Sequence, residues 1–471
     1  MIVISIIPKS KEQILKLKAR YPEYYLEYRL DLTDDWNFID KDTVDERVIM
    51  TIRDRNEAGT GVIQKKLSTA DQKVRLYSDW VHKYGCLVDI EHSLLNKLTA
   101  PELVRLDRSH LIISIHSFDN NWEIIDIARR CLDIERSGCR YGKLALASNS
   151  WEKLLKLETL FRTTSSKILL AFLGEDGISK RCLYRHLGAE GTFVCLNGKE
   201  TATGQLTVDL AEMLGLVSLT GKELIGGIIG GQQVKRSRGI DYYNSLFRAK
   251  KLSAVYLPFI VKDAENFQHW LEAGTRKSKV YGFSVTMPMK RKIASISGKQ
   301  GMIVNLWDGK KEIFNTDLIA MEQILEKYKM LKKSSRILII GSGASAQTTI
   351  QAIAGRAEIF ISSRNFPEAI RLCSKIKAEY FIPENLKGKY FDLIINTTPL
   401  GMNDEDLLDF ASGMDFKIAI DLPYRKGMTP LGRFCKETGK QYVSGMEFWQ
   451  YQTEAQERYF MAAIDKRSSI E

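Results

Sequence analysis

The sequence has few residues that could cross-link the fold or bind a metal. Its seven cysteines are an odd number, lie far apart and include no Cys-x-x-Cys pair. The six histidines show no metal-ligand spacing. This pattern favours reduced thiols in a cytosol over a disulfide framework or a zinc site, and we expect no metal.

Long hydrophobic runs are also missing. No stretch approaches the ~18 consecutive apolar residues that a membrane helix needs. The apolar start, MIVISIIPKS, is short, has no basic segment before it and is closed by Pro8. It therefore predicts a buried strand rather than a secretory signal, and we expect a cytoplasmic protein with no membrane partner.

The sequence lacks a long basic block, although its net charge is +11. Lys and Arg are scattered among Asp and Glu, and no nucleic-acid module is recognisable. A basic surface of this kind attracts anionic metabolites and phosphorylated cofactors, so we expect small-molecule substrates and no nucleic acid. With 471 residues, of which 44% are hydrophobic and 27% charged, the chain predicts two or three globular domains.

The clearest pattern is the stretch RILIIGSGASAQTTIQAIAGRAEIFISSR, in which a glycine turn and a helical pattern separate two apolar runs. This is the size and order of one βαβ unit. Gly341 permits the tight turn, and Gly343 lets the backbone approach a pyrophosphate at the helix N-terminus. The second strand ends in Ser-Ser-Arg instead of an acid, which favours a ribose 2′-phosphate and therefore NADP. An ordinary strand-to-helix turn is the alternative.

Short apolar runs alternate with amphipathic stretches through about the first 215 residues. Strands are predicted at Ile2–Ile7, Tyr24–Arg29, Val48–Arg53, Leu87–Glu91, Leu111–His116, Lys143–Ala147, Ile168–Leu173 and Thr192–Leu196. Helices are predicted at Lys11–Tyr21, Thr69–Tyr84, Asn121–Arg136, Trp151–Arg162, Ile178–Leu187 and Leu206–Leu214. Eight such strands are typical of a closed (β/α)8 TIM barrel, with an open doubly wound sheet as the rival fold.

Polar residues gather where these strands end, which in a barrel is the active-site face. They are Glu27, Arg29, Arg53, Asp89, Glu91 and His116. Lys143 opens an otherwise apolar strand, so desolvation would favour its neutral amine, a nucleophile for ketones. A strand-edge lysine that reaches water is an equally good interpretation. His116 suits a general base or a hydrogen-bonded core imidazole.

The segments LEYRLD, MTIRDRNEAG, SIHSF, GKLALAS, GEDGISKR and TATGQ resemble type I 3-dehydroquinate dehydratases. The resemblance implies a Schiff-base lysine at Lys143, a general acid/base at His116, and at Glu57 a carboxylate that orients this histidine. It also implies substrate contacts at Glu27, Arg29, Arg53, Arg181, Thr201 and Gln205. In that chemistry the lysine condenses with the substrate C3 ketone, and the histidine moves the proton. The final loop departs from the usual Ser-Ala-Pro-Gly-Gln, because Thr203 replaces its proline and a rigid turn is lost.

A Gly-rich passage follows Leu214, and a new α/β unit is predicted from a seam at Lys222–Glu223. Its predicted strands are Leu224–Ile229, Val255–Phe259 and Val280–Val285, with a helix at Ile240–Lys250. Lys290 follows the last strand, and Asp317 lies just before another expected helix. Taken singly, a solvated loop lysine and a helix N-cap are the simpler interpretations.

Taken together, VTMPMK, NTD, the dinucleotide loop, NTTPLGM, DLPYRKGMTPL and a terminal glutamine resemble shikimate dehydrogenases in the same order. The resemblance implies that Lys290 and Asp317 form a catalytic dyad for reduction of a ketone. The implied shikimate contacts are Ser237, Thr286, Asn305, Tyr424 and Gln452. The implied NADP contacts are Gly341, Ser342, Gly343, Ala344, Ser345, Ala346, Ser363, Arg364, Thr398 and Gly445.

The segment QVKRSRGI departs from the family pattern, roughly Pro-Val-x-His-Ser-x-Ser-Pro. One of the two serines expected to bind the shikimate carboxylate is Gly239. Loss of a hydrogen bond to a charged group typically costs ~1.5–3 kcal/mol. Our hypothesis is that Arg236 or Arg238 replaces it with a charge-assisted bond.

We therefore predict two consecutive enzymes in one chain. The predicted domains are a dehydratase barrel at 1–218, a substrate-binding domain at 219–322 completed by a helix at 445–471, and a Rossmann NADP-binding domain at 323–444. The competing interpretations are a quinate-type dehydrogenase fused to another Schiff-base barrel such as an aldolase, and a non-catalytic ligand sensor. A monomer or a homodimer is expected.

Overall fold

The structure is a computed structural model that describes residues 1–469 except 34, 55–68, 96, 120, 148–149, 200–203, 274–275, 404–412 and 426. The chain divides into two compact units, Met1–Met289 and Lys290–Glu471. Each unit has hydrophobic cores of its own.

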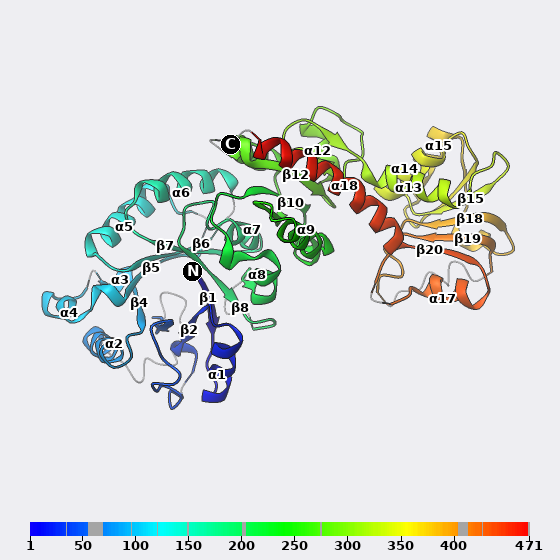
Figure 1. Cartoon of the computed structure of the whole chain (residues 1–471). Coiled ribbons are helices and arrows are strands. Elements are labelled where there is room, and N and C mark those ends of the chain that lie inside the picture. The colour runs from blue at the N-terminus through cyan, green and yellow to red at the C-terminus, as the bar shows by residue number, and fades with distance from the viewer. Residues whose placement is uncertain are drawn as a thin grey trace. The chain divides into compact units, whose positions relative to one another are not determined.

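The first part of unit one is a closed barrel of parallel strands (Figure 1). Its strands are β1 (Ile2–Ile6), β2 (Tyr25–Arg29), β3 (Val48–Thr51), β4 (Leu87–Glu91), β5 (Leu111–Ser117), β6 (Tyr141–Ala147), β7 (Ile168–Leu173) and β8 (Gly191–Cys195). Strand β1 pairs with both β2 and β8, which closes the sheet on itself. The predicted TIM barrel is confirmed, and the open doubly wound sheet is wrong for this part of the chain.

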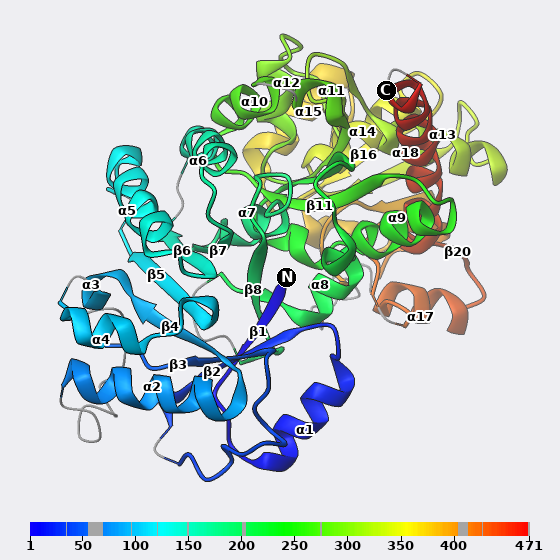
Figure 2. The same cartoon turned by 60° about the vertical axis from the view of Figure 1, so that its left-hand side comes forward.

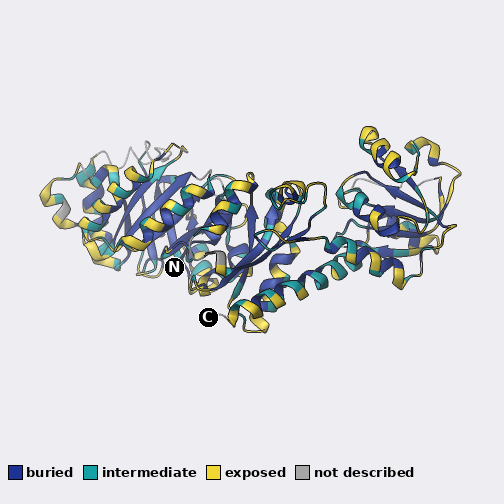
Figure 3. Cartoon of the chain, turned by 90° about the horizontal axis from the view of Figure 1, so that it is seen from above, coloured by how far each residue is buried: buried dark blue, intermediate teal, exposed yellow. Residues whose placement is uncertain are grey.

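Helices cover the outside of the barrel, as the second view shows (Figure 2). They are α1 (Lys11–Arg20), α2 (Ala70–Tyr84), α3 (His92–Leu95), α4 (Ala100–Arg105), α5 (Ile124–Ser137), α6 (Trp151–Thr163), α7 (Gly177–Cys182) and α8 (Val208–Leu214). Helix α5 is typical, because its buried residues Ile127, Cys131 and Ile134 recur every three or four positions. The barrel strands are mostly buried, whereas a long helix such as α5 is buried on one face only (Figure 3).

Two predicted elements differ from the structure by more than their end residues. The predicted helix Ile178–Leu187 ends at Cys182, because the chain then turns and Ala189 N donates to Tyr184 O at 2.9 Å. The stretch Leu206–Leu214 begins as a short strand, β9 (Leu206–Thr207), which pairs with β8 before α8 starts.

The rest of unit one is a parallel three-stranded segment in the order β11-β10-β12. Its elements are β10 (Leu224–Gly230), α9 (Arg238–Ala249), β11 (Ala254–Ile260), α10 (Ala264–Glu272), α11 (Arg276–Lys279) and β12 (Val280–Val285). Helix α9 packs on β11 because Asn244 Nδ2 donates to Tyr256 O, and Tyr256 N donates back to Asn244 Oδ1, each at 2.9 Å.

Unit two contains a doubly wound parallel sheet in the order β17-β16-β15-β18-β19-β20. Its strands are β15 (Arg336–Ile340), β16 (Glu358–Ser362), β17 (Glu379–Tyr380), β18 (Tyr390–Asn396), β19 (Asp415–Asp421) and β20 (Gln441–Ser444), and an antiparallel pair, β13 (Leu306–Trp307) and β14 (Ile313–Phe314), precedes it. Its helices include α12 (Lys290–Ile296), α13 (Thr316–Lys327), α14 (Ala344–Ile353), α15 (Phe366–Ile376), α17 (Pro430–Glu437) and α18 (Gly445–Ser468).

Both faces of this sheet are buried, which explains the continuous apolar runs in the sequence. Ile337 and Ile339 of β15 pack into one core with α13, α14 and α15, whereas Leu338 and Ile340 pack into the other with α17. The predicted Rossmann unit is confirmed.

Candidate active sites

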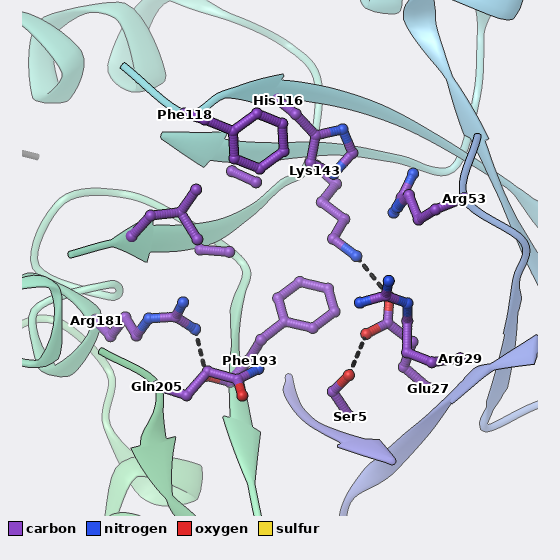
Figure 4. A pocket seen from close by; sticks show the side chains of 13 residues that line it. Ser5, Glu27, Arg29, Arg53, His116, Phe118, Lys143, Arg181, Phe193 and Gln205 are labelled. Carbon is purple, nitrogen blue, oxygen red and sulfur yellow. Dashed lines mark hydrogen bonds and ion pairs between the residues drawn. The ribbon is translucent and has the colours of Figure 1, made fainter. Parts of the chain in front are cut away.

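The polar strand ends of the barrel converge on one cavity of about 100 Å³. It is lined by Ser5, Glu27, Arg29, Arg53, His116, Phe118, Lys143, Ala145, Ala171, Leu173, Arg181, Phe193 and Gln205 (Figure 4). Seven of these residues were predicted as site residues; the other six, among them Ser5, Phe118 and Phe193, were not. A serine within the apolar run IVISI could have indicated Ser5, whereas the two phenylalanines carry no such signal.

Lys143 lies in the middle of β6, and its side chain is 7% exposed. Its Nζ atom donates to Glu27 Oε1 at 2.6 Å and to Asp89 Oδ2 at 3.1 Å, and lies 4.1 Å from the centre of the Phe193 ring. The interpretation as a strand-edge lysine that reaches water is therefore wrong. The amine is buried and held by two carboxylates at the pocket.

Glu27 is the nearest carboxylate to this amine, and it is itself buried in the middle of β2. Ser5 Oγ and Thr51 Oγ1 both donate to it, at 2.6 and 3.1 Å. Burial would raise the pKa of Glu27, but the charges of Lys143 and Arg29 outweigh it and lower the pKa to about 2. The carboxylate is therefore ionised and orients the amine.

Asp89 and Glu91 link Lys143 to two further cations. Arg53 Nη2 binds Asp89, and Arg53 Nη1 lies 3.7 Å from Glu91 Oε1. Lys73 Nζ, which sequence analysis did not single out, binds Glu91 Oε2 at 2.7 Å. The result is a buried chain of alternating charges, Lys143–Asp89–Arg53–Glu91–Lys73, of which Lys143 and Arg53 line the pocket. Burial opposes ionisation of Asp89, but Arg53 and Lys143 outweigh it and lower its pKa.

The other two predicted arginines are held differently. Arg29 donates to Asp31 from Nε and Nη2, at 2.9 and 2.7 Å. Arg181 is fully buried on α7, where its Nε donates to Phe172 O at 2.7 Å and its Nη1 donates to Phe193 O at 2.8 Å. Burial lowers the pKa of Arg181 to about 10, so the guanidinium remains a cation at neutral pH.

His116 lies near the end of β5 and stacks on Phe118, with ring centroids 5.9 Å apart and an interplanar angle of 8°. It shares the pocket with Lys143 and Gln205. Two predicted residues, Glu57 and Thr201, lie outside the described residues. Their predicted roles stay predictions.

In unit two the predicted dyad is a direct ion pair. Lys290 Nζ lies 2.8 Å from Asp317 Oδ2, and the two side chains are 13% and 14% exposed. Asn305 Nδ2 donates to Asp317 Oδ1 at 2.8 Å, so the predicted substrate residue also fixes the dyad. Helix α13 begins at Thr316 with Asn315 as its N-cap, so Asp317 lies in the first turn and is not the cap.

Helix α18 brings the predicted Gln452 to the same place. Gln452 Nε2 lies 3.5 Å from Thr316 Oγ1, and Gln456 Nε2 donates to Asn305 O at 3.1 Å. Gln456 and Thr316 were not predicted. Gln456 lies one helical turn after Gln452, and Thr316 directly precedes Asp317. This spacing is the only signal in the sequence that could have indicated the two residues.

Ser237 and Thr286 lie in unit one. Ser237 is the N-cap of α9 and accepts from Gly239 N, and Thr286 follows β12, where its N donates to Ile229 O at 2.9 Å. A Cβ atom at Gly239 would lie 3.3 Å from Tyr256 Oη, so this phenol crowds the position of the missing serine. Arg236 and Arg238 are both exposed.

The predicted dinucleotide loop connects β15 to α14. Gly341 has a φ of +118°, and a Cβ there would lie 2.5 Å from Thr397 Oγ1, so both conformation and space require glycine. Gly343 is the N-cap of α14, makes no side-chain cap hydrogen bond, and has open space where a Cβ would lie. The first amides of α14, from Ala344 to Ala346, therefore suit a phosphate group.

The end of β16 contributes the other half of this site. Ser342 Oγ and Ser363 Oγ lie 2.9 Å apart, and Ser363 Oγ accepts from Asn365 N. Arg364 is exposed directly after them. Hydroxyl groups and a cation at this strand end fit a 2′-phosphate, where an acid would instead suit a ribose hydroxyl.

The motifs NTTPLGM and DLPYRKGMTPL meet at the ends of β18 and β19. Asn396 Nδ2 donates to Asp421 Oδ1 at 2.7 Å, and Asn396 Oδ1 accepts from Thr398 Oγ1 at 2.7 Å. Burial raises the pKa of Asp421. This network positions Thr398, while Tyr424 is half-buried beyond β19 and Gly445 opens α18.

Among the described residues, no group of three or more His, Cys, Asp or Glu side chains could hold a metal ion. None of the helices built from them has the length and apolar character needed to cross a membrane.

The fold and the two sites define an α/β enzyme that combines a lysine-based barrel site with a dinucleotide-dependent reductase site. Residues 2–220 match the family model for type I 3-dehydroquinase, and residues 229–299 match that for the shikimate dehydrogenase substrate binding domain. Shikimate dehydrogenase (NADP(+)) of Aquifex aeolicus is 31% identical over 239 residues, which are 48% of this chain and 87% of that protein. The chain belongs to the shikimate dehydrogenase family, with a type I 3-dehydroquinase part before it.

Other relatives span both parts. The chloroplastic bifunctional 3-dehydroquinate dehydratase/shikimate dehydrogenase of Arabidopsis thaliana is 23% identical over 383 residues, which are 74% of this chain and 63% of that protein. The solved structure of dehydroquinate dehydratase and shikimate dehydrogenase from S. pombe AroM has a TM-score of 0.37 and 18% identity, covering 99% of this chain and 97% of that chain.

Proposed function

We propose that the barrel pocket dehydrates 3-dehydroquinate to 3-dehydroshikimate, and that the second site reduces this product to shikimate with NADPH. The observation that carries the proposal is the buried Lys143 amine in a pocket that also holds His116. The chain is thus a bifunctional enzyme of the shikimate pathway, a lyase and an oxidoreductase. Both substrates are small anions, in keeping with the net charge of +11.

In the dehydration, Lys143 Nζ attacks the substrate C3 ketone once it has lost its proton, and the ketone oxygen leaves as water. Glu27, at 2.6 Å, orients this nitrogen. The cationic iminium that forms acidifies the neighbouring C2 proton. His116 takes this proton and then protonates the departing C1 hydroxyl, so one imidazole acts first as base and then as acid. At the end of the reaction one water hydrolyses the iminium, which restores the C3 ketone and frees the amine. Arg53 and Arg181 bind the substrate carboxylate.

In the reduction, Lys290 donates a proton to the ketone oxygen as the carbon accepts a hydride, or stabilises the alkoxide that forms. Asp317 keeps this ammonium charged and aimed, since the two groups are 2.8 Å apart. Asn305 and Gln452 orient the substrate hydroxyl groups, and Ser237 and Thr286 keep their predicted roles as substrate contacts.

The amides after Gly343, with Ser363 and Arg364, would hold the pyrophosphate and the 2′-phosphate of NADP. Bound NADPH supplies the hydride for the reduction. Thr398 and Gly445 line the same edge of the sheet as part of the proposed cofactor site.

The proposed domains are 1–218, 219–322 with 445–471, and 323–444. We further propose a cytoplasmic location and a monomer or homodimer. Separation of tagged cell fractions and sedimentation of the purified chain test these two assignments.

The test of function is one assay with two variants. Dehydroquinate and NADPH are mixed with the chain, and loss of the reduced nicotinamide absorbance is followed. Lys143→Ala should abolish this loss but still reduce added dehydroshikimate, whereas Lys290→Ala should form dehydroshikimate and fail to reduce it. If both variants retain both steps, the proposal is wrong.

Gly239 supports a second candidate for the reductase, namely a quinate-type substrate. The missing serine hydroxyl changes the carboxylate site, so turnover of quinate and shikimate should be compared directly. A ligand sensor is disfavoured, because a sensor has no need of the catalytic groups Lys143, His116, Lys290 and Asp317.

A further inference from the structure

Three successive side chains of α7 reach three different parts of unit one, and each is at most 1% exposed. Ser179 Oγ accepts a hydrogen bond of 2.7 Å from Ile260 N, at the end of β11. This strand belongs to the part of unit one that follows the barrel, from β10 on, which we call the dehydrogenase part. Lys180 Nζ lies 5.2 Å from the centre of the Trp151 ring of α6. Arg181 lines the barrel pocket. One short element therefore joins a strand of the dehydrogenase part to the dehydratase pocket.

Helix α7 has little stability of its own. It has six residues, and its N-cap, Asp176, makes no side-chain cap hydrogen bond because its carboxylate pairs with Lys180 Nζ at 3.0 Å. A helix this short is not stable in isolation. Its place must come from the residues that it contacts.

Some of those contacts reach the dehydrogenase part directly, and one reaches it through α6 of the barrel. The Trp151 ring beneath Lys180 packs on Phe267 and Trp270 of α10, with ring centroids 4.8 Å apart in both pairs. In the loop before α7, Glu175 O accepts from Gln232 Nε2 at 3.2 Å. Both the start and the middle of this segment are thus anchored outside the barrel.

Arg181 connects α7 to the barrel strands at the pocket. Its guanidinium is tied to Phe172 O of β7 and Phe193 O of β8. The helix can therefore move only by bending this side chain or breaking these bonds. A displacement of about 1 Å in a substrate-binding cation is enough to weaken binding substantially.

We propose that Ser179 is a positioning residue of the dehydratase, because its hydrogen bond to Ile260 sets the place of α7 and hence the aim of Arg181. The three-stranded segment of the dehydrogenase part is then a structural component of the dehydratase site. This inference rests on the proposed function, in which Arg181 binds the carboxylate of dehydroquinate.

The experiment uses the full chain without NADPH, so that only dehydration proceeds, followed by the ultraviolet absorbance of the conjugated product. Ser179→Ala should raise the KM for dehydroquinate about tenfold and change kcat much less, since substrate binding and not proton transfer is affected. Asn266→Ala is the matched control. Asn266 Oδ1 also connects the dehydrogenase part to the barrel, because it accepts from Trp151 N at 2.8 Å. Among the described residues, however, the hydrogen bonds of Asn266 do not reach α7. The KM of Asn266→Ala should therefore stay within about twofold of wild type.

A KM for Ser179→Ala within about twofold of wild type overturns the inference, as does an equal rise in Asn266→Ala. If Ser179→Ala does not fold, the KM of Gln232→Ala is measured instead, because Gln232 holds the loop before α7. A rise in KM smaller than that expected for Ser179→Ala supports the inference, and no rise overturns it. Arg181→Met separates the inference from the proposed function. An unchanged KM in that variant refutes the role of Arg181, whereas a raised KM there with an unchanged KM in Ser179→Ala refutes the inference alone.

Discussion

Replacing Lys73 with methionine should destabilise unit one strongly. Lys73 is 5% exposed and its partner Glu91 is fully buried, with Nζ and Oε2 2.7 Å apart. Removing one partner of a buried ion pair typically costs about 3–5 kcal/mol. Here Glu91 would lose its nearest compensating charge and keep the more distant Arg53. For a unit of this size that corresponds to a fall of roughly 6–20 °C in Tm.

The double variant Lys73→Met with Glu91→Gln should recover most of this loss. Both charges are then gone, and the introduced glutamine amide would keep an oxygen that can accept from Asp54 N, as Glu91 Oε1 does at 3.1 Å. Calorimetric melting of the full chain measures the transitions. Lys16→Met is the matched control, because the Lys16–Glu12 pair is exposed and its loss should leave the melting temperature almost unchanged. A double variant as unstable as Lys73→Met, or a single variant no worse than the control, would refute the reasoning.

Lys290→Met should lower kcat of the reduction by about 10²–10⁴-fold with dehydration unchanged, and an equal loss of both activities would contradict the dyad. Arg364→Ala should raise the KM for NADPH but not that for NADH, and parallel changes would contradict a 2′-phosphate contact. Arg236→Ala or Arg238→Ala should raise the KM for shikimate if either replaces the missing serine, and no change in either variant excludes both. The pKa of Glu27 is about 2 in the fold against 4.5 ordinarily, so on the order of 3 kcal/mol of stability is present above pH 4.5 and is lost as the pH falls toward 2. Glu27→Gln should flatten the acid side of the curve of unfolding free energy against pH, and an unchanged slope would contradict this assignment.

The strand ends of the barrel could be predicted because local pattern determines them. Short apolar runs identified β4 and β7 to the residue, and the rule that barrel chemistry lies at strand C-termini indicated Glu27, Arg53 and His116. The residue roles beyond this required the resemblance to known families.

The partners within the site could not be predicted, because they depend on which side chains face one another across the closed barrel. Lys73 belongs to an amphipathic helix, where sequence alone favours a solvated lysine, yet it is buried against Glu91. The end of the helix at Cys182 was missed for a similar reason. Tertiary contacts of Ser179 and Arg181 determine that segment, and its local pattern does not.

In helix α18, the number of residues between Gly445 and Gln456 matters as much as their identity. A Cβ at Gly445 would lie 2.3 Å from Leu422 O, so the helix starts in close contact with the end of β19. Gln452 and Gln456 reach Thr316 only in the present helical phase. Inserting one residue between Gly445 and Gln452 would rotate both amides by about 100° around the helix axis. Homologous chains should therefore vary along this segment by substitution, while gaps in their alignment fall elsewhere.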